Sequence, residues 1–349
     1  SDAKLAKKDL SSVWLDLANA YGSVPHELIF FALKRYGIPD RWFSIVKNYY
    51  ESLWSKSFDN SAPSSWHHHE RGIFTGCTIS IVLFVAAINV VIEYITSEPV
   101  ECYQTSTNIP LPPIRAFMDD MNLMSSSIEG TQQLLQRSCK ALEWARMECR
   151  PTKSRCIVIK KGRSLSDTPF SSAVRDQQSS QVIPSIHTNP IKFLGRVVNG
   201  ALNDKKSVAD IEKKLNEGLK LIHRSKLGGK EKLWILSNLL IAKIRWPIMI
   251  YEISITTCLK LERRTSYFIR KWLRLPQSIS TVALYSTSSP CALPLISLSF
   301  LVKNAKLQIS KKQEKLNTYL LEKGIPKLTF RKRYTKTYLL EKGIPKLTF

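Results

Sequence analysis

The order of apolar segments along residues 11–160 limits the possible folds more than any other feature of this sequence. Residues 11–17 form a short apolar run that ends near a Gly-Ser-Val-Pro turn, which predicts a buried strand. The segments that follow are predicted as helices at 26–36, 40–54, 78–95 and 130–147, and as strands within 114–126 and at 156–160. The resulting order is strand, helix, strand, strand, helix, strand.

That order is typical of an α+β fold with a split βαβ, or ferredoxin-like, arrangement. In this arrangement the first strand and the central hairpin are neighbours. Asp16 follows the first strand, and the Asp119-Asp120 pair is expected to form the tight turn of the hairpin. We therefore expect Asp16 and Asp119 to meet although they are far apart in sequence.

Residues beyond 160 predict a second, all-helical part. The Ser/Gln-rich stretch 162–190 reads as a surface hairpin or loop, and 191–200 as another strand pair. Helices are expected at 205–223, 229–245 and 256–273, with Lys and Arg on their polar faces. The expected domains are therefore 1–200, a helical domain at 201–310 and a basic tail at 311–349.

The tail contains a literal repeat, because TYLLEKGIPKLTF occurs at 318–330 and again at 337–349. Two copies are too few for a solenoid, and a duplication or a sequence-assembly artefact explains them without a function. The run RKRYTK at 331–336 reads as a solvated tail or as a nuclear-import or nucleic-acid patch.

The positive charge is confined to the later part of the chain. The net charge is +24, but residues 1–130 contain 10 Lys and Arg against 14 Asp and Glu. The remaining residues carry 42 basic and 14 acidic side chains. This division favours a polyanionic partner for the second part of the chain, although two domains with unrelated surfaces would also produce it.

The cysteines and the apolar segments indicate the cellular environment in which the chain is expected. The seven cysteines are scattered without a C-x-x-C pair, which argues against a disulfide framework or a zinc ribbon and favours a reducing, intracellular environment. Residues 1–10 are polar and charged, so no signal peptide is expected. The uncharged run 79–92 is shorter than the roughly 20 residues that span a bilayer, so a buried core helix is favoured over membrane association.

Asp16, Asp119 and Asp120 stand out because they lie among apolar residues. Buried carboxylates are costly unless they are paired or bound to metal, and oxygen ligands suit Mg²⁺ or Mn²⁺. Two such ions about 4 Å apart can catalyse phosphoryl transfer. Because strand side chains alternate, Asp16 and Asp119 are expected as the principal ligands, with Asp120 nearer the rim. The alternative is an acidic hairpin turn without a metal.

Five segments in a fixed order make the chain recognisable. They are WLDLANAYGSVPH (14–26), RGIFTGCTISIVLF (71–84), AFMDD (116–120), RPTKSR (150–155) and KFLG (192–195). Together they resemble the palm motifs of reverse transcriptases, most closely those encoded by non-LTR retrotransposons. The resemblance covers about 11–200 and continues more weakly to about 310. It implies a polymerase right-hand palm followed by a helical thumb.

The resemblance also implies roles for individual residues. Asp16 and Asp119 would hold two Mg²⁺ ions, or Mn²⁺, with the backbone carbonyl of Leu17 as a further ligand and Asp120 assisting. Lys153 would protonate the pyrophosphate leaving group, although a solvated loop lysine is the alternative. Tyr21 would lie against the sugar and exclude a ribose 2′-hydroxyl.

Other implied sites contact the nucleic acid. Gly72, Thr75 and Gly76 belong to a segment that would lie under the incoming base pair, and Phe193, Leu194 and Gly195 would grip the primer end. Candidates for phosphate contacts in the helical part are Lys226, Lys230, Lys232, Arg263, Arg264, Arg270 and Lys271. Trp234, Trp246 and Trp272 are expected in the core, and His67, His68 and His69 in a solvated loop rather than a metal site.

The sequence departs from the family pattern in two ways. Thr75 replaces a common Gln, and Ser80-Ile81 replaces a common Ser-Pro, which puts the base-pair contact in question. Only 15 residues precede Asp16, so the fingers are expected to be largely absent.

The function expected from the sequence is that of a retrotransposon-encoded RNA-directed DNA polymerase. It would use an RNA template, a DNA primer and deoxynucleoside triphosphates within an intracellular, nuclear or cytoplasmic ribonucleoprotein, with its oligomeric state open. The alternatives are a non-catalytic nucleic-acid-binding remnant, a nuclease that uses the same carboxylates, and, least favoured, a membrane protein.

Overall fold

The computed structural model describes residues 2–56, 64–106, 108–166, 170–173, 180–286, 293, 295–308 and 311. The repeat and the basic run near the C-terminus lie outside these residues. The chain divides into two compact units, Ser1–Leu194 with Val198–Leu202 and Gly195–Val197 with Asn203–Phe349. Each unit is described by itself.

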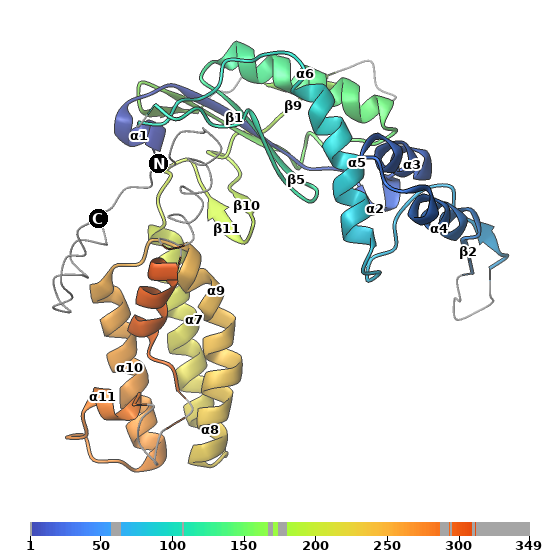
Figure 1. Ribbon diagram of the computed structural model, residues 1–349. Helices are drawn as coiled ribbons and strands as arrows, with labels where there is room; N and C mark the ends of the chain where they lie inside the picture. The colour runs from blue at the N-terminus through green and yellow to red at the C-terminus, as the bar shows by residue number, and fades with distance from the viewer. Residues whose placement is uncertain are drawn as a thin grey trace, which may run out of the picture. The chain divides into compact units, whose positions relative to one another are not determined.

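The first unit is built on a five-stranded antiparallel sheet with the order β4-β5-β1-β6-β7 (Figure 1). Its strands are β1 (Leu10–Leu15), β4 (Ile114–Phe117), β5 (Asp120–Ser125), β6 (Arg155–Lys160) and β7 (Arg163–Leu165). The central strand β1 pairs on one side with β5, with Leu15 opposite Met121. On the other side it pairs with β6, with Trp14 opposite Arg155. The predicted α+β class and the adjacency of β1 and the central hairpin are confirmed.

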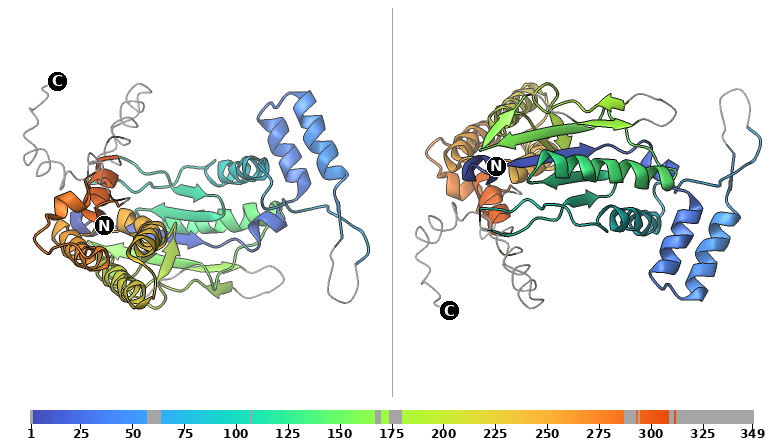
Figure 2. Two further views of the ribbon diagram at one scale, coloured as in Figure 1. Left: turned by 90° about the horizontal axis from the view of Figure 1, so that it is seen from below. Right: turned by 90° about the horizontal axis from the view of Figure 1, so that it is seen from above.

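Six helices belong to this unit among the described residues. They are α1 (Asp2–Ala6), α2 (Ala20–Ser23), α3 (His26–Arg35), α4 (Asp40–Glu51), α5 (Ser80–Ile95) and α6 (Ile128–Trp144). Figure 2 shows α6 along one face of the sheet. The hydroxyl of Ser127 caps α6 by accepting a hydrogen bond from the Gly130 N–H.

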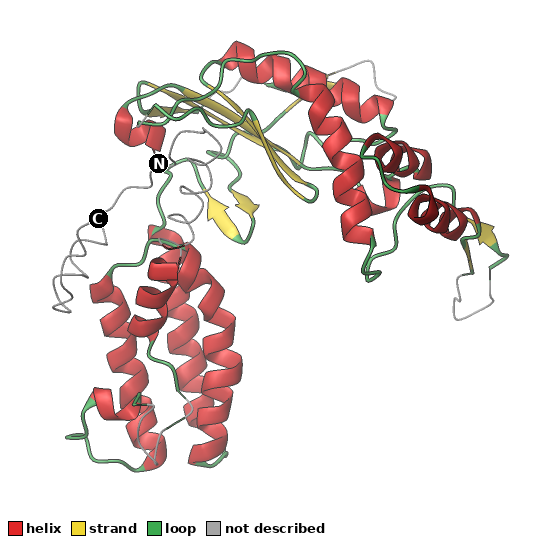
Figure 3. Ribbon diagram, in the orientation of Figure 1, coloured by secondary structure: helices red, strands yellow, loops and turns green. Residues whose placement is uncertain are grey.

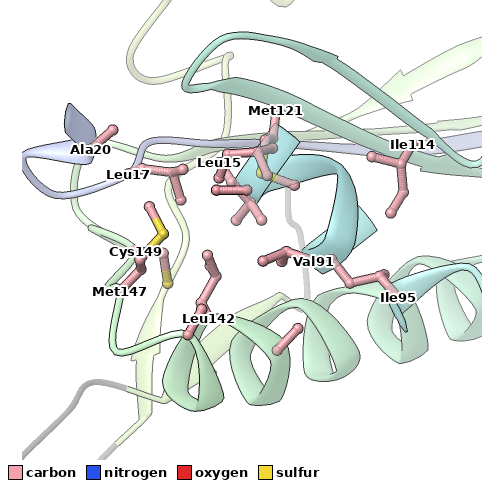
Figure 4. Packing of buried hydrophobic residues seen from close by; sticks show 14 of the residues in the cluster. Leu15, Leu17, Ala20, Val91, Ile95, Ile114, Met121, Leu142, Met147 and Cys149 are labelled. Carbon is pink, nitrogen blue, oxygen red and sulfur yellow. The ribbon is translucent and has the colours of Figure 1, made fainter. Parts of the chain in front are cut away.

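The core of the first unit lies between the sheet and these helices. Leu15 and Leu17 project from the β1 segment, and Met121 from β5, toward α5 and α6 (Figure 4). Half of the residues of α5 are buried, including Leu83, Phe84 and Val91, so its prediction as a core helix is confirmed, while Ile81 and Val82 are exposed. Because strand side chains alternate, Trp14 and Asp16 face the opposite side of the sheet. Burial of the leucines therefore directs Asp16 away from the core.

The central hairpin turns one residue earlier than predicted. Phe117 pairs with Asp120, so the turn consists of Met118 and Asp119 rather than Asp119 and Asp120. Met118 takes a positive φ of 57°, the backbone conformation that tight hairpin turns require. Asp120 is consequently the first residue of β5.

Several short strands complete the chain. They are β2 (Trp54–Ser55), β3 (His67–His68), β8 (Ser171–Ala173), β9 (Ser180–Val182), β10 (Ile191–Phe193) and β11 (Arg196–Val198). The last two confirm the strand pair expected at 191–200. The stretch 162–190, expected as a loop or hairpin, contains β7, β8 and β9, with part of it outside the described residues.

Among the described residues, the regular structure of the second unit is helical apart from Arg196 and Val197, which belong to β11 (Figure 3). Its helices are α7 (Lys205–Arg224), α8 (Gly229–Ile235), the π-helix η1 (Leu236–Ile241), α9 (Ala242–Ile250), α10 (Ile255–Leu273) and α11 (Thr281–Leu284), and residues 298–308 are also helical. Its own core includes Leu215, Leu219, Leu236 and Ile269. The helix expected at 229–245 thus continues to Ile250.

The π-helix changes which side of this long helix meets the core. A π-turn holds one residue more than an α-turn and so rotates the residues after it by about 100°. Trp234 and Trp246, twelve residues apart, therefore lie on nearly the same side. Both are more than half exposed, whereas Trp272 is buried. The core prediction was right for Trp272 and wrong for Trp234 and Trp246. For Trp246, sequence periodicity does not reveal the π-turn that precedes it.

Two other sequence expectations have structural counterparts. Six of the cysteines lie among the described residues, and no disulfide joins any two of these six. The helical stretch Gly229–Ile250 is long and apolar enough to cross a membrane by length and composition, with a third of that stretch buried inside the protein. Core helices of soluble proteins also satisfy this test, and α5 is shorter.

Candidate active site

A pocket of about 260 Å³ lies at the carboxyl end of β1. Residues from four separate segments line it, and all belong to the first unit. They are Trp14, Leu15, Asp16, Asp120, Lys153, Arg155, Pro190, Ile191, Lys192 and Phe193. The sequence-predicted residues Asp16, Asp120, Lys153 and Phe193 therefore meet in one place.

Asp16 and Asp120 reach the pocket because of the sheet register. Leu15 lies opposite Met121, so the next residues along the two antiparallel strands, Asp16 and Asp120, share the face opposite the core. Asp119 lies in the exposed turn and is not among the residues that line the pocket. Asp120 rather than Asp119 thus lines the pocket, because the turn begins one residue earlier than predicted; which of the two carboxylates holds a metal stays a prediction.

The three carboxylates nevertheless share one electrostatic environment. Burial raises the pKa of Asp120, and the negative charges of Asp119 and Asp16 raise it further. Such mutual repulsion is relieved when a cation binds, so this end of the sheet favours positive charge.

The backbone around Asp16 is fixed by the segment that precedes β6. The hydroxyl of Ser154 accepts a hydrogen bond from the Asp16 N–H at 3.1 Å, and the Asp16 carbonyl accepts one from the Arg150 N–H at 2.8 Å. Ser154 is fully buried and also donates to the Arg150 carbonyl. Both the N–H and the carbonyl of Asp16 are therefore fixed by hydrogen bonds.

Leu17 forms an isolated antiparallel bridge with Cys149. The bonds of this bridge come from the flanking residues, including Ala18 N–H to the Glu148 carbonyl at 2.7 Å. In such a pair the central residue directs its own carbonyl to the other side of the strand. The Leu17 carbonyl therefore points toward the side on which β1 pairs with β5.

These oxygen atoms form an open set of ligands. Among the described residues, no three His, Cys, Asp or Glu side chains lie close enough together to hold a metal ion by themselves. Mg²⁺ is usually bound by one or two carboxylates together with water and substrate phosphates, rather than by a complete protein cage. Asp16, Asp120 and the Leu17 carbonyl, with Asp119 on the adjacent turn, fit that kind of binding.

Lys153 lies on a tight turn beside the carboxylates. Its N–H donates to the Arg150 carbonyl at 3.1 Å, and its side chain lines the pocket together with Arg155 and Lys192. Three cations therefore surround the two pocket carboxylates, an arrangement that suits a ligand with several negative charges.

Tyr21 lies next to the central hairpin. Its ring stacks on Phe84 with centroids 4.5 Å apart, and its hydroxyl lies 3.6 Å from the Met118 sulfur. Tyr21 is thus held between α5 and the turn that carries Asp119.

The glycine-containing segment 72–76 packs against the chain near Tyr21. The Ile73 N–H donates to the Tyr21 carbonyl at 2.7 Å, and the Gly72 N–H donates to the Val24 carbonyl at 2.8 Å. Gly72 has a φ of +93°, and a Cβ there would lie 3.0 Å from the Gly22 carbonyl oxygen. Both facts require glycine at this position. Thr75 and Gly76 are exposed at the end of the segment.

The three residues expected to grip a primer do not all lie at the pocket. The Phe193 ring lines the pocket with its centroid 6.5 Å from that of Trp14. Leu194 has a positive φ of 48° and belongs to the first unit. Gly195 belongs to the second unit, where the Trp246 indole nitrogen lies 2.6 Å from the position that a Cβ would take.

The predicted phosphate contacts separate into exposed and buried residues. Lys226, Lys230, Arg263, Arg264 and Lys271 are exposed, and Lys232 is half-buried. Arg270 is buried, and its guanidinium donates to the Ile279 carbonyl at 2.7 Å and to the Thr281 hydroxyl at 3.2 Å. Its inclusion was wrong, because it fixes the loop after α10 instead of facing solvent.

Sequence reasoning missed two residues that organise this site. Ser154 and His26 both lie inside the quoted motifs, RPTKSR and WLDLANAYGSVPH, yet neither has an obvious chemical role in the sequence. His26 is buried, and its Nε2 lies 2.9 Å from the Gly72 carbonyl oxygen. Only the position of each residue inside a motif could have drawn attention to it.

Comparison with known proteins identifies the fold that carries this site. The family model described as reverse transcriptase (RNA-dependent DNA polymerase) matches residues 1–198, more than half of the chain. The chain belongs to the reverse transcriptase family. The match includes both strands with the three aspartates, the Lys153 turn and the Gly72 segment.

Among the relatives of this chain are Pol polyproteins of R2 retrotransposable elements. It is 22% identical over 295 residues to that of the type-2 element R2DM of Drosophila melanogaster, which covers 84% of this chain and 27% of the relative. It is 25% identical over 285 residues to that of the type-1 element R2 of Nasonia vitripennis, covering 79% and 26%. The chain thus spans about a quarter of the length of these relatives.

Among solved structures, the chain resembles telomerase from Candida albicans, determined in complex with a TWJ fragment of telomeric RNA. The TM-score is 0.37 with 11% sequence identity, over 75% of this chain and 44% of the telomerase chain.

Proposed function

We propose that this chain is the polymerase part of a non-LTR retrotransposon protein and adds deoxynucleotides to a primer 3′-hydroxyl on an RNA template. The observation that carries the proposal is the convergence of Asp16 and Asp120 in one pocket, with Asp119 on the adjacent turn, inside the region that matches the reverse transcriptase family. In this proposal the first unit is the palm of a right-hand polymerase and the second is its thumb.

Reverse transcriptases use divalent metal ions. Asp16, Asp119 and the Leu17 carbonyl would hold two Mg²⁺ ions, with Asp120 assisting from the pocket wall. When bound, these ions lower the pKa of the attacking hydroxyl and neutralise the charge that develops on the phosphates. The carboxylates and the Leu17 carbonyl are available from neighbouring strands, which supports this assignment.

The remaining residues position the substrates. The Lys153 Nζ would donate a proton to the departing pyrophosphate, and the Lys153 turn is tied to Asp16 through Ser154. The Tyr21 ring, supported by Phe84, would contact the deoxyribose and leave no room for a 2′-hydroxyl. Phe193 beside the pocket would contact the primer end.

The exposed Lys and Arg side chains of the second unit would bind phosphates of the template and primer. Phosphate contacts provide affinity without sequence preference, which suits a polymerase that must move along its template. Location in an intracellular ribonucleoprotein remains a prediction.

Primer extension tests the proposal. The Asp16→Asn and Asp119→Asn variants keep the size of the side chains and remove the negative charge. We expect incorporation of deoxynucleotides to fall at least about 100-fold in each variant, and chelation of divalent ions with EDTA to abolish it in the unaltered chain. Asp210→Asn, at an exposed position of α7, is the control and should leave the rate unchanged.

Two outcomes would contradict the assignment. Equal rates for the unaltered chain and Asp119→Asn would remove this residue from catalysis. If the unaltered chain binds nucleic acid in a salt-dependent manner and incorporates nothing, the alternative of a non-catalytic binding remnant is correct. The high positive charge of the later part of the chain favours that alternative as the second candidate.

A further inference from the structure

His26 is a buried side chain for which the proposed chemistry has no use. It is the first residue of α3 and is 6% exposed. A buried imidazole is normally kept because it makes a specific hydrogen bond. Here its Nε2 lies 2.9 Å from the carbonyl oxygen of Gly72, in a segment far away in sequence.

The chemistry of this contact fixes the state of the ring. A carbonyl oxygen only accepts, so the Nε2 atom must carry the proton and donate. Burial lowers the pKa of His26, the hydrogen bond to the Gly72 carbonyl opposes this shift, and the nearby His69 and His68 add to it, so the net effect favours the neutral ring. The ring also packs against Tyr50, with centroids 4.5 Å apart.

The backbones on either side of this contact run together. Pro25 forms an isolated antiparallel bridge with Arg71, and the His26 N–H donates to the Glu70 carbonyl. The Gly72 and Ile73 N–H groups donate to the Val24 and Tyr21 carbonyls. The His26 imidazole adds one side-chain hydrogen bond to these backbone bonds, by donating to the Gly72 carbonyl.

The hydrogen bond of His26 affects Tyr21 through the backbone of Gly72 and Ile73. Ile73 is bonded to the Tyr21 carbonyl at 2.7 Å, and Gly72 lies against the backbone of Gly22, the next residue. Any displacement of the Gly72 peptide therefore displaces the support of Tyr21. Tyr21 and the 72–76 segment are the two parts that the proposed function assigns to the sugar and the incoming base pair.

We propose that His26 is a positioning residue for the nucleotide site. By donating from Nε2 to the Gly72 carbonyl, it locks the 72–73 backbone against Tyr21 and so sets the fit of the incoming deoxynucleotide. The inference rests on the proposed polymerase function. It assigns to His26 an effect on nucleotide binding and sugar selection, without a role in the chemical step.

Two substitutions separate the hydrogen bond from the bulk of the ring. His26→Gln retains an N–H donor at nearly the reach of Nε2, whereas His26→Leu fills the space without a donor. In primer extension with a single deoxynucleotide, we expect His26→Leu to raise KM about tenfold and to lower the preference for deoxyribonucleotides over ribonucleotides. Its kcat should remain within about threefold of the original value. His26→Gln should restore both KM and the preference.

Amide hydrogen exchange provides a readout that needs no activity. The Gly72 and Ile73 amides should exchange at least about tenfold faster in His26→Leu than in the unaltered chain or in His26→Gln. The Ala18 and Arg150 amides, which are bonded around Asp16, serve as internal controls and should not change. His223→Gln, in the second unit, controls for the loss of a histidine elsewhere.

The outcomes distinguish failure of this inference from failure of the proposed function. An unaltered chain that incorporates nothing overturns the polymerase proposal, and the amide exchange at Gly72 and Ile73 then decides whether His26 holds the segment. Equal exchange in all variants overturns the inference. A folded His26→Leu chain with unchanged KM, or a fall in kcat alone, overturns it as well.

Discussion

At the scale of single residues, the site depends on side chains that touch no substrate. Ser154 is fully buried and accepts from the Asp16 N–H while it donates to the Arg150 carbonyl. That carbonyl also accepts from the Lys153 and Ser154 N–H groups. Loss of the Ser154 hydroxyl would thus leave the Asp16 N–H as the group without a partner.

We therefore expect Ser154→Ala to lower the free energy of unfolding by about 1–3 kcal/mol, the cost of an unsatisfied buried donor. It should also reduce primer extension, because the backbone that carries Asp16 gains freedom. Urea unfolding and single-nucleotide incorporation measure the two effects.

Ser138→Ala is the matched control. Ser138 is equally buried, but its hydroxyl donates only within α6, to the Leu134 carbonyl. Alanine is favoured in helices, so we expect a change below about 0.5 kcal/mol. If both variants lose the same stability, the bond to Asp16 contributes nothing specific.

The same scale explains which site residues could be predicted. Asp16 and Asp119 stand out in sequence because carboxylates are unusual beside apolar strands. The hydroxyl of Ser154, the imidazole of His26 and the buried guanidinium of Arg270 make their bonds to backbone atoms of other segments. Sequence spacing contains no information on such partners, so two of these residues were missed and the third was misassigned.

At the scale of secondary-structure elements, two glycines in the second unit show how closely its helices pack. Gly229 begins α8, and a Cβ there would lie 2.6 Å from the Trp272 carbonyl oxygen on α10. At Gly218, within α7, a Cβ would meet only the flexible end of the Leu240 side chain.

We expect Gly229→Ala to destabilise the second unit by about 1–3 kcal/mol, because a backbone carbonyl cannot move aside without shifting a helix. Gly218→Ala should change stability by less than about 1 kcal/mol, since the gain in helix propensity offsets the movement of Leu240. The urea midpoint followed by tryptophan fluorescence measures both. Equal losses would mean that α8 and α10 do not pack as closely as described.

The positions of most helices and strands could be predicted from the sequence, but not which residues of each face the core. The strands β1, β5 and β6 and the helices α3 to α6 follow from apolar periodicity in the sequence. The hairpin turn at Met118 and Asp119 and the π-turn at Leu236–Ile241 each displace the pattern by one residue. Those single residues decide whether Asp119 or Asp120 lines the pocket and which side of the helix carries Trp246.

At the scale of the whole molecule, charge is divided along the chain. The first 130 residues are slightly acidic, and the later ones carry the entire positive excess. For nucleic acid, binding by exposed cations weakens steeply with salt, by close to one unit of slope for each phosphate contact on a duplex.

We expect replacement of five exposed cations by Gln to reduce the salt slope of template–primer binding by up to about four. The residues are Lys226, Lys230, Arg263, Arg264 and Lys271. Binding measured by fluorescence anisotropy between 50 and 200 mM salt, roughly the range over which such contacts weaken, gives the slope.

The control is a variant in which five exposed cations of the first unit are replaced by Gln, so that the net charge changes by the same amount. Its residues, also exposed, are Lys34, Arg41, Lys140, Arg146 and Lys161. Their replacement should change the slope by less than about one. Equal effects of the two sets would indicate that net charge, rather than the surface of the second unit, attracts the nucleic acid.

The position of β1 in its sheet has a consequence for how the protein is made. This strand lies in the centre, yet its partners Leu123 on β5 and Cys156 on β6 follow Val13 by more than a hundred residues. At a synthesis rate of about 5–20 residues per second, β1 leaves the ribosome many seconds before either neighbour exists. A nascent strand with two open edges is prone to mispair. The carboxylate pocket can therefore form only after β6 has been synthesised, and until then at least one edge of β1 is unpaired.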